Sequence, residues 1–84
     1  MDLKQILTDI ARAIVDTPDA VNVVENVDGD NVELILTVAE DDTGMVIGRH
    51  GKIAKAIRQI MKAAANTCGK HVTMWYSLNL KVLL

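Results

Sequence analysis

The chain has 84 residues, half of them hydrophobic and only one of them proline, which excludes a disordered segment and indicates one small folded domain. No apolar run is long enough to span a membrane, the first residues lack the pattern of a signal peptide, and the lone Cys68 excludes an internal disulfide framework, so we expect a cytoplasmic protein. The net charge of −2 combines −9 in residues 1–42, with eleven acids and two bases, and +7 in residues 43–84, with seven bases and no acid.

The first third of the chain predicts a helix and the first strand of a hairpin. Apolar residues recur at helical spacing between Leu3 and Ile14, and Asp2 is a candidate N-cap with Gln5 as its capping-box partner. Thr17-Pro18 ends this helix, because the residue before a proline avoids helical geometry. The valine-rich stretch 21–24 then predicts a short strand.

A hairpin turn and a second strand are expected next. Asp28-Gly29-Asp30 favours a tight turn. Val32, Leu34, Leu36 and Val38 alternate with residues of the other face, which predicts a strand with one side buried.

The second half predicts two helices joined by a glycine-bracketed loop, and then a strand. Acids at 40–42 precede a short helix over residues 44–47, and Gly69 ends a long helix over 52–68. The apolar stripe expected to be buried on the long helix is Ile53, Ile57, Ile60, Met61 and Ala64. Residues 72–77 predict a third strand, and the apolar tail 78–84 either prolongs that strand or packs separately.

The predicted order of elements is helix, strand, strand, helix, helix, strand, which indicates one α+β domain over residues 1–77. The first two strands form an antiparallel hairpin, and the second and third are parallel because two helices connect them by a crossover. We therefore expect a three-stranded mixed sheet with all helices packed on one face.

The loop Gly48-Arg49-His50-Gly51 has the chemistry of a phosphate contact. Its two glycines allow a tight turn and a close approach of the backbone to a ligand. The helix that follows presents unpaired N–H groups and the positive end of its dipole. Lys52, Lys55, Arg58, Gln59 and Lys62 lie opposite the apolar stripe. Two plainer interpretations remain, an ordinary solvated helix face and a pairing of opposite charges across the fold.

The segment Val46-Ile47-Gly48-Arg49-His50-Gly51-Lys52-Ile53-Ala54-Lys55-Ala56-Ile57-Arg58 resembles the signature of KH domains. The helix and two strands ahead of it match the type II arrangement, and residues 1–77 resemble the small stand-alone KH proteins of bacteria (KhpA-type). This resemblance implies a groove that holds about four nucleotides of single-stranded RNA, with the loop against the backbone. The residues implied or expected at this groove are Gly44, Ile47, Gly48, Arg49, His50, Gly51, Lys52, Ile53, Ala54, Lys55 and Arg58.

Within that set, the resemblance implies different roles. Gly48 and Gly51 contact the backbone, while Arg49, His50 and Lys52 lie near phosphates. Gly44, Ile47, Ile53 and Ala54 form a small apolar floor for the bases. The resemblance also implies a role as an RNA chaperone or post-transcriptional regulator, and a homodimer or a pairing with a larger KH-containing RNA-binding protein. The dimer contact would use Ile60, Met61 and Ala64 or the tail.

Other classes of function fit the sequence less well. The loop lacks the preceding glycine and the following Ser or Thr of a P-loop. Cys68, His50 and His71 form no catalytic pattern, and the acids lack the spacing of a metal loop, so we expect no enzyme, metal, cofactor or small-molecule substrate. The serious alternative is a KH fold used for protein association, with little RNA binding of its own.

Overall fold

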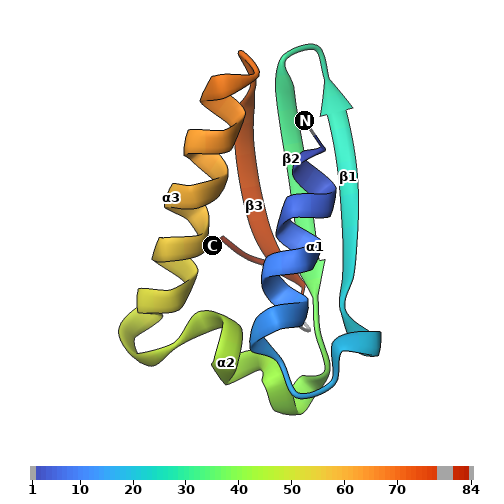
Figure 1. Cartoon of the computed structure of the whole chain (residues 1–84), viewed down its shortest axis with the longest axis vertical. Helices are drawn as coiled ribbons and strands as arrows, with labels where there is room; N and C mark the ends of the chain where they lie inside the picture. Colours follow the sequence, from blue (N-terminus) through green and yellow to red (C-terminus); the bar gives the residue numbers. More distant parts are fainter. Residues whose placement is uncertain (1, 78–80, 84) are drawn as a thin grey trace.

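The computed structural model describes residues 2–77 and 81–83. In chain order the elements are α1 (Leu3–Ile14), β1 (Asn22–Asp28), β2 (Asn31–Thr37), α2 (Thr43–Ile47), α3 (Lys52–Thr67), β3 (His71–Ser77) and β4 (Lys81–Leu83), with single 3-10 turns at Pro18–Ala20, Glu40–Asp42 and Arg49–Gly51. The sheet order is β1-β2-β3-β4, antiparallel between β1 and β2, parallel between β2 and β3, and antiparallel between β3 and β4. The helices lie on one face of the sheet (Figure 1). The predicted fold class is confirmed.

The fourth strand is the one addition to the expected sheet. Lys81–Leu83 turns back and pairs with Trp75–Ser77, so this part of the tail neither prolongs β3 nor packs separately from the sheet. Residues 78–80 and 84 of the predicted tail lie outside the described residues.

Helix α1 begins at the predicted cap with a different side-chain pairing. The Asp2 carboxylate accepts from the Gln5 backbone N–H at 3.1 Å, whereas the Gln5 side chain donates to Asp9 Oδ1 at 2.8 Å and not back to Asp2. One of the helix's unpaired N–H groups is therefore satisfied, and the reciprocal half of the capping box is replaced by a contact four residues along the helix.

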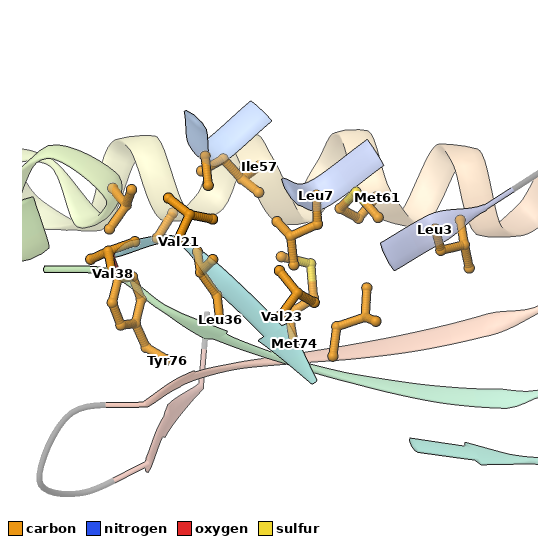
Figure 2. Close-up of a cluster of buried hydrophobic side chains, with 14 of the residues drawn as sticks. Leu3, Leu7, Val21, Val23, Leu36, Val38, Ile57, Met61, Met74 and Tyr76 are labelled. Atoms are coloured by element: carbon orange, nitrogen blue, oxygen red, sulfur yellow. The ribbon is translucent and has the colours of Figure 1, made fainter. Parts of the chain in front are cut away.

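The core lies between the helices and the sheet. Figure 2 shows Leu7 of α1 and Ile57 and Met61 of α3 among side chains that include Leu36 and Met74 of the sheet. The alternation predicted for β2 is confirmed, since Val32, Leu34, Leu36 and Val38 are all buried. Val46 of α2 and Ile57 and Met61 of α3 are buried in this core, which fixes both helices that flank the glycine loop.

The buried stripe of α3 differs from the predicted one. The helix buries Ala54, Ile57, Met61 and Ala65, Ile53 and Ala64 lie at the edge of the core, and Ile60 is 52% exposed. The prediction for Ile60 was wrong because α3 is rotated so that Ile57 and Met61 point at the sheet. In this rotation the side chain of Ile60 points outward, toward solvent. No helix in the described ranges is long and apolar enough to cross a membrane.

Candidate nucleic-acid interface

The loop between α2 and α3 depends on its first glycine for two separate reasons. Gly48 has φ +75°, and a Cβ built on it would lie 2.7 Å from Cγ1 and 2.9 Å from Cβ of Ile53. Such distances are below those of real contacts, so any side chain here displaces Ile53 or the turn. The close packing of Ile53 against Gly48 fixes the loop on the first turn of α3.

The two residues after Arg49 continue the unusual backbone. His50 has φ +58° and is the non-glycine residue with positive φ in the described chain, and Gly51 follows with φ +73°. Histidine is among the residues that enter this region more often than most, yet the conformation still costs about 1–2 kcal/mol. A strained, exposed residue between two glycines indicates that the loop's shape serves something other than stability.

The start of α3 presents donors that the protein does not use. Gly51 caps the helix without any side-chain hydrogen bond, and the first turn contains no acid. The turn's own bonds run from the Gly48 N–H to the Gly44 carbonyl at 2.8 Å and from the Gly51 N–H to the Gly48 carbonyl at 3.2 Å, and the Lys52 N–H donates to the Arg49 carbonyl. None of these bonds involves the N–H of Arg49 or His50. These two groups, at the positive end of a 16-residue helix, are donors of the kind that stabilise an anion.

In the described part of the chain, the lysine and arginine side chains around this helix end have no ion-pair partner. Arg49, His50, Lys52 and Lys55 are exposed, and Arg58 is half-buried with a buried Nε that has no hydrogen-bond partner. Among the described residues the single ion pair joins Lys70 to Asp30 at 3.7 Å. The alternative that opposite charges pair across the fold therefore fails in this part of the chain, and the charge of the loop and of α3 remains available to a ligand.

The residues expected to form the apolar floor do not all reach the surface. Gly44 is exposed, and a Cβ added to it would meet no atom within 4 Å, whereas Ile47 and Ile53 are half-buried. Ala54 is only 7% exposed and belongs to the core, so little of its surface is open to a ligand. The surface beside the loop is thus made by Gly44, Ile47 and the edge of Ile53.

The two flanks of α3 have opposite characters. Lys55, Arg58 and Lys62, spaced three and four residues apart, share the flank that lies toward β3, where Lys62 borders a hollow with His71 and Val72. The other flank carries Ile53, Ile60 and Ala64 and faces α1, which packs beside α3 on the same side of the sheet (Figure 1). A polyanion and an apolar partner would therefore meet different sides of one helix.

A buried contact below α2 was not predicted from the sequence. Asp42 is 3% exposed, and its Oδ2 accepts from the Thr17 backbone N–H at 2.9 Å. Burial, followed by the nearby Asp42 carboxylate, raises the pKa of Tyr76 from 10.0 to about 12. Asp42 thus joins the segment after α1 to the start of α2, the helix that leads into the glycine loop. The run Glu40-Asp41-Asp42 gives no sign of which acid is buried.

Comparisons with known proteins identify the family of this chain. The family described as "KhpA/KhpB, KH domain" matches residues 4–74. The chain is 47% identical over 72 residues to the RNA-binding protein KhpA of Clostridium acetobutylicum, covering 86% of this chain and 96% of that protein. It is 42% identical over 72 residues to the same-named protein of Halalkalibacterium halodurans, covering 86% and 95%. It is 37% identical over 70 residues to that of Bacillus subtilis, covering 83% and 86%.

No solved structure matches the chain significantly. The family match spans the glycine loop, both flanking helices, β1, β2 and the first four residues of β3, and it ends at residue 74. The chain therefore belongs to the KhpA/KhpB family of bacterial KH domains.

Proposed function

We propose that this protein binds single-stranded RNA, with about four nucleotides held between the glycine loop and the face of α3 that carries Lys52, Lys55 and Arg58. The observation that carries the proposal is the start of α3, where unused backbone donors, a strained glycine loop and unpaired cations lie together. The names of the relatives, RNA-binding protein KhpA, support the same ligand.

The proposed contacts follow from the exposure of each residue. Backbone N–H groups of Arg49 and His50 and of the first turn of α3 receive a phosphate, while Gly48 and Gly51 allow its approach. Arg49, Lys52 and Lys55 neutralise neighbouring phosphates. Gly44 and Ile47 offer a small surface on which a base can lie, and Ala54 supports this surface from within the core. The protein would act on RNA in the cytoplasm as a chaperone or regulator, without catalysis.

Reversing the charge of the loop tests the proposal. Arg49→Asp with His50→Asp places carboxylates against the phosphates, and Asp is one of the few residues that tolerates the backbone of His50. We expect affinity for a fluorescently labelled oligouridine to fall at least about tenfold, since two phosphate contacts become repulsive.

The matched control for this variant is Lys4→Asp with Arg12→Gln on α1, which changes the formal charge by the same three units away from the loop. If both variants bind equally well, with the fold intact by circular dichroism, the loop is not the RNA site. Wild-type affinity should also fall with rising salt, with a slope of about −0.7 per phosphate contact on a single strand.

A second candidate function, association with another protein, is favoured by the apolar flank of α3. Ile60 is 52% exposed beside the half-buried Ile53 and Ala64, and Ile6 and Ile10 of α1 are also half-buried. We infer that this seam between α1 and α3 pairs with a second copy or with a larger KH-containing protein. Met61, by contrast, is fully buried and cannot contribute directly.

Ile60→Asp tests this surface, because an exposed residue can be replaced without opening the core. Light scattering at several concentrations should show a dimer for the wild type and a monomer for the variant. A wild-type protein that stays monomeric at the highest concentration would overturn the dimer. An Ile60→Asp protein that still dimerises would place the contact elsewhere.

A further inference from the structure

The far end of α3 carries a hollow that the proposed four-nucleotide groove does not use. Its volume is about 240 Å³, and its lining is Lys62, Ala65, Asn66, Lys70, His71 and Val72. Lys62, Asn66 and His71 are exposed. Cationic and amide side chains therefore surround this space, with a buried alanine at its base.

The backbone holds these side chains in place. Helix α3 ends with Gly69 at φ +71°, where the Lys70 N–H donates to the Ala65 carbonyl at 2.8 Å and the Gly69 N–H to the Asn66 carbonyl at 3.1 Å. This pair of bonds is a Schellman motif, which turns the chain sharply back beside the helix. The His71 N–H then donates to the Asp30 carbonyl at 2.8 Å, so the side chains at 70 and 71 start from fixed positions.

The charge around the hollow favours an anion, although the carboxyl end of α3 beside it is the negative end of the helix dipole. The carboxyl end of a helix carries about half a negative charge, but two of its carbonyls already accept the bonds of the Schellman motif. Lys62 and Lys70 contribute two positive charges. Asp30 offsets one of them through a pair of 3.7 Å, with Asp30 itself 76% exposed. A pair this exposed is weak, so a phosphate can compete for Lys70.

The hollow continues the basic flank that begins at the glycine loop. Lys55 and Arg58 precede Lys62 on the same flank, and the 16 residues of α3 span about 24 Å. Among the described residues β4 pairs only with Trp75–Ser77, so the outer edge of β3 from His71 to Met74 lies open beside the hollow. One RNA strand can follow this side of the domain from the loop to the hollow.

We propose that Lys62, Lys70 and His71 form a second phosphate-binding site, which takes the backbone of an RNA strand already held at the glycine loop. This inference rests on the proposed function and extends it, since the footprint becomes longer than four nucleotides. A second contact on the same strand acts at high effective concentration and raises affinity without any base readout. Longer single strands are therefore the preferred ligands.

The test compares oligouridines of four and ten nucleotides on the full-length chain, using Lys62→Gln with Lys70→Gln. We expect the decanucleotide to bind this double variant about tenfold more weakly than it binds the wild type, and the salt slope to fall by about 1.4. Affinity for the tetranucleotide should change less than twofold. Lys4→Gln with Arg12→Gln is the control with an equal loss of charge. Amide NMR spectra of the wild type should show Lys70 and His71 shifting with the decanucleotide only.

The outcomes separate this inference from the function on which it rests. A decanucleotide also offers seven registers to a four-nucleotide site, so it can bind more tightly than a tetranucleotide without any second site. The decisive comparison is therefore the affinity of the double variant for the decanucleotide against that of the α1 control. If the double variant and the α1 control bind the decanucleotide alike, the second site is refuted while tetranucleotide binding still supports the loop. If Arg49→Asp with His50→Asp leaves both oligonucleotides bound, the loop site itself is refuted.

Discussion

The two ends of α3 are both bracketed by a glycine with positive φ, yet they are built for opposite purposes. At the carboxyl end, Gly69 completes a Schellman motif, and Cys68 Sγ lies 3.3 Å from the Ala64 carbonyl. At the amino end, Gly51 caps the helix with no side-chain bond and no acid in the first turn. One end satisfies its own backbone, and the other leaves its donors exposed. This difference in backbone bonding supports the amino end of α3 as the place of the proposed glycine-loop contact with RNA.

Among substitutions at the two ends of α3, replacement of Gly48 should lower the free energy of unfolding most. Gly48→Ala adds a Cβ at 2.7 Å from Ile53 Cγ1 and keeps φ at +75°, so strain and overpacking both act. We expect the free energy of unfolding to fall by about 2–4 kcal/mol. Urea denaturation measures this change, and a loss smaller than that of Gly69→Ala would contradict the described packing of Ile53 on the loop.

Gly69→Ala should cost less, because only the backbone conformation opposes it. No atom lies within 4 Å of a Cβ at this position, although φ is +71°. The expected loss is about 1–2 kcal/mol. RNA affinity at the glycine loop should be unchanged in the folded variant. A loss of tetranucleotide binding would show that the two ends of α3 are coupled.

Tyr76 gives a pH test of the packing below the loop. The phenol oxygen is buried without a hydrogen-bond partner, so Tyr76→Phe should be neutral or stabilising by up to about 1 kcal/mol at pH 7. The pKa of Tyr76 is raised from 10.0 to about 12, so the folded protein keeps this proton where the unfolded chain releases it. The contribution of the Tyr76 phenol to stability is complete below its ordinary pKa of 10.0. This contribution is lost as the pH rises through its pKa in the folded protein, about 12.

Thermal unfolding of wild type and Tyr76→Phe at pH 9 and pH 11 measures this contribution. The wild type should lose more stability between these values than the variant does, since lysine titration is common to both. Equal losses would mean that Tyr76 ionises freely in the folded state, which is incompatible with its burial beside Asp42.

The smallest effect is expected at His50. Asn enters the left-handed region more readily than most residues, so His50→Asn should raise the free energy of unfolding by a few tenths of a kcal/mol. Urea denaturation of the wild type and the variant measures this change. A variant that is less stable than the wild type would contradict the positive φ described for His50.

The sequence predicted the order of elements and the loop because both depend on local signals. The alternation of Val32–Val38 and the glycines at 48, 51 and 69 act over a few residues. The rotation of α3 about its axis depends on the position of α1. In the sequence, Ile57, Ile60 and Met61 are all apolar and all fit a buried helical stripe. Ile60 was therefore assigned to the core in error, and the burial of Ala54, which is 7% exposed, was not predicted.

Long-range contacts account for the other differences. Asp42 accepts a hydrogen bond from the backbone of Thr17, 25 residues earlier. Nothing in the run Glu40-Asp41-Asp42 shows which of its three acids makes this contact. The antiparallel pairing of β4 with β3 joins two short segments whose apolar residues suit several arrangements. The hollow at Lys62 could not be predicted from the sequence, because it forms only where the Schellman motif places residues 70 and 71 beside α3.

Backbone amide NMR of the labelled protein, titrated with a single-stranded tetranucleotide, tests the central claim most directly. We expect the largest shifts at Gly48 to Lys52, with little change at Gly69 to His71, because only the amino end of α3 leaves its donors unpaired. Shifts centred on the carboxyl end of α3, or on the seam between α1 and α3, would contradict the assignment of the glycine loop as the RNA-binding site.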